Sequence, residues 1–110
     1  MAGKFELYKD KKGEFRFRLK SGNGENILAS EGYKAKASAK NGIESVKKNC
    51  RDLKRFEMKK SKSRKQMFNL KAGNSQVIGT SQMYKTEAAC SNGIKSVKTN
   101  APKAKVEDLT

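Results

Sequence analysis

The sequence predicts an α+β fold in which two tandem repeats of three strands and a helix share one antiparallel sheet, with both helices packed on one face. The first observation is an internal match without gaps: residues 5–49 align with residues 56–100, and 21 of the 45 aligned pairs are identical. Such a register indicates a duplicated unit. The second observation is that each copy contains segments of alternating apolar and polar residues, followed by one segment with helical spacing.

The duplication also favours order over disorder. Leu, Ile, Val and Phe make up 19 of the 110 residues and the formal net charge is +15, a combination that is typical of disordered chains. However, the repeated positions include most of the apolar residues. A unit of about 50 residues buries too little surface to be stable alone. We therefore expect one domain over residues 1–110, made of a first repeat at 4–50, a second at 55–101 and a C-terminal strand or tail at 102–110.

Three strands are expected in the first repeat, because apolar and polar side chains alternate there. They lie around residues 5–8, 15–20 and 25–30, and the turns at 10–13 and 21–24 contain Gly, Asn and Asp. The strands of the second repeat are expected near 56–60, 65–71 and 76–81. The outward side chains of the second strand are Arg16, Arg18 and Lys20.

A helix is expected after the third strand of each repeat, because apolar residues there recur every three or four positions. The apolar faces are Ala39, Ile43, Val46 and Cys50 in the first repeat, and Cys90, Ile94, Val97 and Ala101 in the second. Thr86 is a plausible cap for the second helix, whereas Ala35 at the matching position is a weaker one. Gly42 and Gly93 lie inside the helices, where glycine is unfavourable, so they suggest close packing of helix on sheet; a tolerated weak point is the alternative.

Several motifs of the chain occur together in a known family. They are Phe5-Glu6-Leu7, Phe15-Arg16-Phe17-Arg18-Leu19-Lys20, Gly22-Asn23-Gly24-Glu25, Ile27-Leu28, Tyr33 and Gly42-Ile43-Glu44-Ser45-Val46, with their copies in the second repeat. With these motifs nearly the whole chain resembles the YegP-like family of small bacterial and archaeal proteins. The resemblance implies two three-strand-plus-helix motifs, each followed by a further strand, with these trailing strands exchanged between motifs. It implies no catalytic residue and no cofactor, and it implies a monomer, since the two motifs pair within one chain.

Composition excludes several classes of function. Histidine is absent, which excludes His-dependent triads and His metal ligands. Cys50 and Cys90 lie on the apolar helix faces, where buried reduced thiols are expected, and two cysteines alone cannot build a structural zinc site. No apolar run approaches the roughly 20 residues of a membrane helix, and no signal peptide is recognised. We expect a cytoplasmic protein that does not insert into membranes and holds no metal.

An enzyme is not indicated either. Glu6 and Glu57 lie on outer strand faces, where pairing with neighbouring Arg and Lys residues is the expected role. Ser81, Tyr84 and Lys85 could suggest dehydrogenase chemistry, but the chain is too short and lacks the glycine pattern of a nucleotide-binding fold. We therefore predict no catalytic site.

The basic residues are concentrated locally. Residues 47–65 contain ten Lys and Arg residues against two acids, and the outward stripe of the second strand adds three more. Such surfaces attract polyanions through phosphate contacts. The candidate polyanion-binding residues are Arg16, Arg18, Lys20, Lys47, Lys48, Arg51, Lys54, Arg55, Lys59 and Lys60.

Two functions remain open at this point. The first is a basic binding module that engages nucleic acid through phosphates without reading the base sequence. The second is a structural or protein-interaction accessory module, in which the charge serves only solubility. The five phenylalanines are expected in the core, which leaves Tyr8 as the aromatic residue among the outward basic ones, so a base-stacking platform is not indicated.

Overall fold

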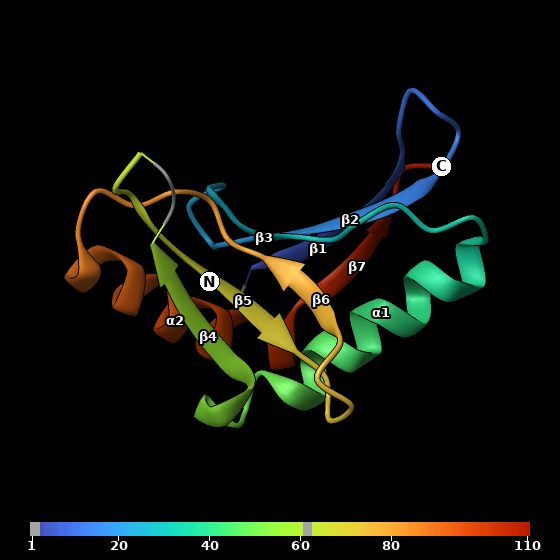
Figure 1. Cartoon of the computed structure of the whole chain (residues 1–110). Coiled ribbons are helices and arrows are strands. Elements are labelled where there is room, and N and C mark those ends of the chain that lie inside the picture. Colours follow the sequence, from blue (N-terminus) through green and yellow to red (C-terminus); the bar gives the residue numbers. More distant parts are fainter. Residues whose placement is uncertain (1–2, 61–62) are drawn as a thin grey trace.

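The computed structural model describes residues 3–60 and 63–110 and shows an α+β fold with one seven-stranded sheet and two long helices. In chain order the elements are β1 (Lys4–Lys9), β2 (Phe15–Lys20), β3 (Asn26–Ala29), α1 (Lys36–Asn49), η1 (Leu53–Arg55), β4 (Phe56–Lys60), β5 (Gln66–Lys71), β6 (Val77–Thr80), α2 (Glu87–Asn100), η2 (Ala101–Lys103) and β7 (Lys105–Asp108). The labels η1 and η2 denote short 3-10 helices. Both long helices lie on the same side of the sheet, as the sequence predicts (Figure 1).

The strands of both repeats lie in one sheet with the order β4-β5-β6-β3-β2-β1-β7. Neighbouring strands within each repeat are antiparallel, and β3 and β6 join the repeats through an antiparallel pairing of Ala29 with Thr80. β7 instead runs parallel to β1, with Lys105 opposite Lys4. The sheet is therefore mixed. This corrects the expectation of a wholly antiparallel sheet, because side-chain alternation is the same in both strand directions.

The strand that follows each helix pairs with a strand that leads to the other helix. β4 follows α1 and is also the first strand of the second repeat, where it pairs with β5. β7 follows α2 and pairs with β1 of the first repeat. The exchange of trailing strands that the family resemblance implies is thus present. The C-terminal segment, for which the sequence left a strand and a loose tail open, forms a strand at the edge of the sheet.

One hydrophobic core lies between the sheet and the helices, and matched residues of both repeats contribute to it. Phe17 stacks on Tyr33 with ring centroids 6.3 Å apart, and Phe68 stacks on Tyr84 at the same separation. Each stacked pair lies beneath the helix of its own repeat, next to the helical glycine. The duplicated sequence therefore produces duplicated packing inside a single core.

Two of the five phenylalanines expected in the core are only half-buried. They are Phe15, whose ring centroid lies 5.3 Å from Lys9 Nζ, and Phe56, which lies in the edge strand β4. The other three are fully buried. The edge of the sheet thus leaves one expected core residue partly open to solvent.

The repeats depart from symmetry where β3 meets β6. Leu28 of β3 is buried, and the matching residue of β6 is Gly79. A Cβ atom at Gly79 would lie 2.7 Å from Leu28 Cδ2. The junction between the repeats therefore has room for one large side chain, not for two.

The helical glycines allow the close packing that the sequence suggests. A Cβ atom at Gly42 would lie 2.8 Å from both Tyr33 Oη and Phe17 Cε2, and one at Gly93 would overlap the hydroxyl group of Tyr84. Any larger side chain would push the helix away from the sheet. Close packing, rather than a tolerated weak point, is the reason for these two glycines.

The helices begin at matched positions with different caps. At α2 the hydroxyl oxygen of Thr86 accepts a hydrogen bond from Ala89 N at 3.0 Å, which confirms the predicted cap. At α1 the matching residue is Ala35, and no side chain caps the helix. The first turn of α2 also carries Glu87, whereas that of α1 carries no acid. α2 is thus the better-terminated helix.

Candidate polyanion-binding surface

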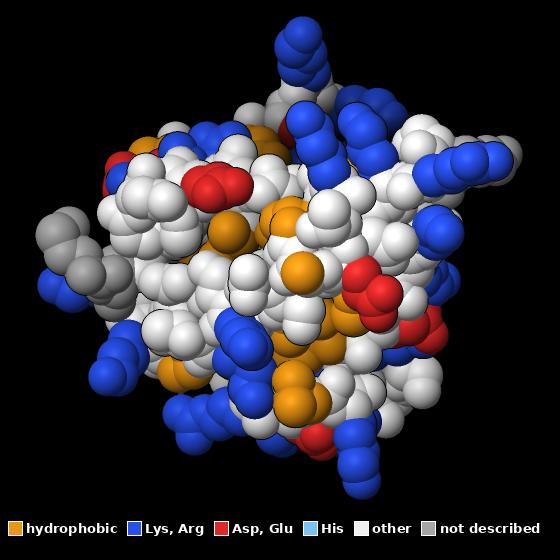
Figure 2. Space-filling view, turned by 90° about the vertical axis from the view of Figure 1, so that its left-hand side faces the viewer, with side chains coloured by type: hydrophobic (Ala, Val, Ile, Leu, Met, Phe, Trp, Pro, Cys, Tyr) orange, Lys and Arg blue, Asp and Glu red, His pale blue; other side chains and the backbone are white. Residues whose placement is uncertain are grey.

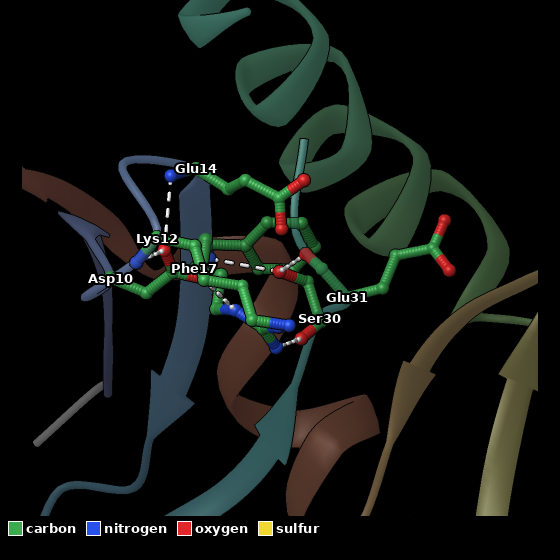
Figure 3. A network of polar contacts seen from close by, with 7 residues as sticks. Asp10, Lys12, Glu14, Phe17, Ser30 and Glu31 are labelled. Atoms are coloured by element: carbon green, nitrogen blue, oxygen red, sulfur yellow. Dashed lines mark hydrogen bonds and ion pairs between the residues drawn. The ribbon is translucent and has the colours of Figure 1, made fainter. Parts of the chain in front are cut away.

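Asp10, Lys12, Glu14 and Ser30 belong to a polar network at the β1–β2 turn (Figure 3). Arg16, the first residue of the basic stripe on β2, joins this network. Its Nε donates to Asp10 Oδ2 at 2.6 Å, and its guanidinium also donates to Ser30 O at 3.3 Å. Asp10 Oδ1 accepts hydrogen bonds from the backbone N–H groups of Lys12 and Glu14. The Arg16 side chain, followed by the turn amides, lowers the pKa of Asp10 below its usual value. Arg16 is therefore engaged within the fold.

Arg18 and Lys20, the other two residues of the stripe, converge on Glu6 of β1. Glu6 Oε1 lies 2.6 Å from Arg18 Nε and 3.3 Å from Lys20 Nζ. Lys4 Nζ lies 3.5 Å from the other oxygen of Glu6 and 2.7 Å from Glu107 of β7. The hydrogen bond from Arg18, supported by Lys20, holds the pKa of Glu6 below its usual value although burial acts in the opposite direction. The predicted cross-strand pairing of Glu6 is confirmed.

The matching carboxylate of the second repeat has the same role. Glu57 lies 2.9 Å from Lys71 Nζ and 3.2 Å from Lys59 Nζ, and these two lysines lower the pKa of Glu57. Its side chain is 40% exposed, against 8% for Glu6.

Lys62, which the sequence places within the basic segment, lies outside the described residues.

Five candidate cations form no such ion pair among the described residues. One of them is Lys60, at the end of β4, and the other four lie near one another in the chain. We call Lys47, Lys48, Arg51 and Lys54 the α1–η1 cluster, because they lie on the last turn of α1 and on the segment through η1. None of the four forms an ion pair within residues 3–60 and 63–110.

The surface around the α1–η1 cluster is hollowed. Lys47, Lys48 and Arg51 line a groove of about 340 Å³ together with Glu44 and Pro102. The groove therefore brings three cations of the cluster to one concave surface, beside η2.

Two further charged residues adjoin the α1–η1 cluster. Arg55 is 3.9 Å from Asp52, whose carboxylate also accepts a hydrogen bond from Lys54 N and caps η1. Lys98 of α2 is close enough to Cys50 to act on its thiol together with Arg51. Sequence reasoning missed Lys98, because it belongs to the other repeat and approaches only through helix packing.

The candidate residues thus form three separate groups. β2, with the stripe, and β4, with Lys59 and Lys60, are separated by β5, β6 and β3, which places them about 19 Å apart at the usual strand spacing. The α1–η1 cluster lies at the end of α1 (Figure 1). This helix covers the face of the sheet that is opposite to the outward face with the basic stripe. The basic stripe therefore does not adjoin Lys59 and Lys60 in the folded chain.

The side of the molecule at the left of Figure 1 has a different character (Figure 2). Apolar side chains and uncharged surface occupy much of its middle, with acidic side chains beside them, and Lys and Arg project mostly around its margin. A groove of about 540 Å³ lies between α2 and the β2–β3 turn, and its lining includes Asn23, Tyr84, Asn92 and Ser96. Ser81 is not part of it, because its hydroxyl accepts from Phe68 N and donates to Gln82 O inside the sheet. The Ser81 hydroxyl is therefore engaged with the backbone of the sheet.

The cysteines are free and buried, as the sequence predicts. Burial raises the pKa of Cys50 and that of Cys90, which keeps both as thiols. In the described part of the chain no three His, Cys, Asp or Glu side chains are grouped so that they could hold a metal ion. The described helices are also too short and too polar to cross a membrane.

Comparison with known proteins places the chain in a family. The family model described as a domain of unknown function, DUF1508, matches residues 10–57 and again residues 61–108. The chain belongs to the DUF1508 family. The first DUF1508 match begins after β1 and ends two residues into β4, and the second begins after β4 and ends with β7.

Bacterial DUF1508 relatives match over their whole length. The UPF0339 protein in the ptx operon 5′ region of Stutzerimonas stutzeri is 62% identical over 109 residues, which cover 99% of this chain and 98% of that protein. The UPF0339 protein YegP of Escherichia coli strain K12 is 51% identical over 110 residues, all of both chains. The predicted YegP-like membership is thereby confirmed. Neither name contains an enzyme activity.

Two solution NMR structures of DUF1508 relatives have the same fold. YegP from E. coli matches with a TM-score of 0.95 at 51% identity, covering 100% of this chain and 95% of that one. The UPF0339 protein SO3888 from Shewanella oneidensis matches with a TM-score of 0.94 at 51% identity, covering 100% and 93%. The exchanged-strand architecture is therefore that of the family.

Proposed function

We propose that the chain is a non-enzymatic binding module that holds nucleic acid through phosphate contacts at the α1–η1 cluster. The observation that supports this proposal is the difference between the candidate groups. Arg16, Arg18 and Lys20 are engaged by carboxylates of the sheet, whereas the cluster is not. A phosphate can approach unpaired cations without first breaking an ion pair within the protein.

The groove at the cluster suits a phosphate oxygen. Lys47, Lys48 and Arg51 line it from one side, with Glu44 as its one acidic residue among the lining side chains. The backbone contributes little, because the C-terminal end of α1 carries the negative end of the helix dipole. Binding would therefore depend on side-chain charge, and it would weaken as salt rises.

Base recognition is not part of the proposal. Tyr8, the aromatic residue that the sequence left for base stacking, is covered by the Arg18 guanidinium at 4.5 Å from its ring centroid. Phosphate contacts alone fix position and carry no sequence information. We therefore expect similar affinity for unrelated sequences of equal length.

The test is a salt titration with fluorescently labelled random duplex and single-stranded DNA, read by anisotropy. One variant replaces Lys47, Lys48, Arg51 and Lys54 with Ala. A control variant replaces four exposed lysines elsewhere, Lys11, Lys12, Lys85 and Lys95, and loses the same formal charge. Each lost phosphate contact removes about 0.9 from the slope of log affinity against log salt on duplex DNA. We expect the cluster variant to lose about 3–4 in slope and the control to change little.

Two results would contradict the proposal. The first is no binding by the wild-type chain at about 50 mM salt, where non-specific phosphate contacts are strong. The second is an equal loss in both variants, which would show that net charge rather than the cluster carries the interaction.

A further inference from the structure

β4 occupies in the second repeat the place that β1 occupies in the first, and residues 4–8 align with residues 55–59. β1 has a strand on both sides, β2 and β7. β4 pairs with β5 and stands at the end of the strand order. Among residues 3–60 and 63–110, no strand therefore covers in the second repeat the edge that β7 covers in the first; we call it the open edge.

The exposure of matched residues follows this difference. Phe5 and Leu7 of β1 are fully buried, whereas the matching Phe56 is half-buried and Met58 is 37% exposed. The carbonyl of Leu7 accepts a hydrogen bond from Leu109 N at 2.8 Å. The equivalent carbonyl on the open edge is that of Met58. The open edge thus offers both apolar surface and backbone hydrogen-bonding groups.

β7 shows which side chains hold a strand in this position. Val106 lies opposite Phe5. The next residue, Glu107, pairs with Lys4 at 2.7 Å. The residue after that, Asp108, pairs with the first residue of α1, Lys36, at 2.5 Å.

The second repeat carries a modified set of residues at the matching positions. Phe56 matches Phe5, Arg55 matches Lys4, and Glu87 matches Lys36. The first position stays aromatic and the second stays basic, but the third is acidic in the second repeat and basic in the first. A strand on the open edge would thus meet apolar, basic and acidic groups in that order.

We propose that the open edge of β4 binds an extended segment of a partner protein, parallel to β4, with the consecutive pattern apolar, acidic, basic. The apolar residue lies opposite Phe56, the acidic residue pairs with Arg55, and the basic residue pairs with Glu87. Main-chain hydrogen bonds to β4 supply affinity, and the two charged pairs supply selectivity.

A second copy of this chain fits the edge less well. Its own β7 would place Asp108 beside Glu87, and like charges in contact are unfavourable. Lys59 and Lys60 also place two positive charges on the edge strand itself, which is a common protection against edge-to-edge association. The charges therefore select a different chain.

The experiment uses the isotopically labelled full chain and two end-blocked synthetic peptides, followed by backbone amide chemical shifts. The probe peptide has the sequence of residues 104–110 with Asp108→Lys, and the reference peptide keeps Asp108. We expect the probe to shift the amides of β4, with about two- to fivefold tighter binding than the reference, as is usual for one exposed charged pair. No shifts at millimolar peptide, or shifts centred on β1 through displacement of β7, would overturn the proposal.

Two variants make the test specific. Glu87→Lys restores the charge found at Lys36 and should reverse the preference between the two peptides; an unchanged preference would contradict the assigned register. Met58→Pro removes a backbone donor from the open edge and should abolish the shifts while the rest of the spectrum stays native. Neither residue belongs to the α1–η1 cluster, so the outcome is independent of nucleic-acid binding.

Discussion

Glu6 is the carboxylate on which the cations of the first half of the sheet converge. Because Arg18 and Lys20 lower its pKa, it stabilises the fold fully above the ordinary Glu value of 4.5, and this contribution is lost as pH falls through the lower pKa of the folded state. We expect Glu6→Gln to lower the free energy of unfolding at pH 7 by about 1–3 kcal/mol, since hydrogen bonds to charged groups have this size. Urea denaturation at pH 7 and at acidic pH measures the difference.

The control for Glu6 is the matching residue of the second repeat. Glu57 has two lysine partners but a much more exposed side chain, so Glu57→Gln should have a clearly smaller effect, because solvent screens its pairs. Below the pKa of folded Glu6 the wild-type chain and Glu6→Gln should converge. Equal effects of the two substitutions, or a Glu6→Gln effect that persists in acid, would be inconsistent with this account.

For single residues, the sequence predicts whether a side chain forms an ion pair better than it predicts the partner. The pairing of Glu6 with strand cations follows from alternation. The partnership of Asp10 with Arg16 does not, because it depends on the geometry of a turn. Turn residues themselves vary: Gly24 has a φ of 86°, and the matching Ser75 keeps a φ of 69° without being glycine. The second repeat thus keeps the positive φ of this turn although the glycine that usually adopts it is replaced by serine.

The helix caps allow a matched test at the scale of the element. Thr86→Ala removes the cap of α2 and should lower the free energy of unfolding by about 1 kcal/mol, whereas Ala35→Thr should raise it by up to about 1 kcal/mol through a new cap on α1. Thermal unfolding followed by circular dichroism should show shifts of roughly 3–6 °C in opposite directions. Shifts of the same sign would contradict the assigned helix starts.

Most elements could be predicted because the same pattern occurs twice in the chain. A strand that is ambiguous in one repeat, such as 76–81, is supported by its copy at 25–30. The direction of β7 could not be predicted, since one apolar residue, Val106, among polar neighbours fits either direction. The short helix η1 was also missed, because its start depends on the Asp52 side chain accepting from Lys54 N, which is a local contact without periodicity.

For the whole molecule, the shared core predicts a single unfolding transition. Leu28 of the first repeat fills the space beside Gly79 of the second, and each trailing strand belongs to the other repeat's half of the sheet. Amide resonances from both repeats should therefore disappear at the same urea concentration, and Thr86→Ala should move both midpoints equally. Separate midpoints for the two repeats would show that each folds by itself.

The candidate site was the part that the sequence predicted least well. Lys47 to Lys60 are close in sequence, but a strand carries Lys59 and Lys60 away from the end of α1. Lys98 arrives there from the other repeat. Residues that are neighbours in the sequence stay close in space within one helix or strand, but not from one element to the next. The basic segment spans a helix end, a turn and a strand, so its cations lie in separate places in the fold.

The parallel pairing of β7 with β1 also has a consequence for how the chain emerges from the ribosome. β1 is translated before the other six strands of the sheet and β7 after them, yet the two are neighbours. Until β7 has left the exit tunnel, the outer edge of β1 stays unpaired, as the edge of β4 does in the finished fold. β1 therefore gains its second neighbour only after the second repeat has been translated. Until then the nascent first repeat exposes an unpaired strand edge that can pair with other chains.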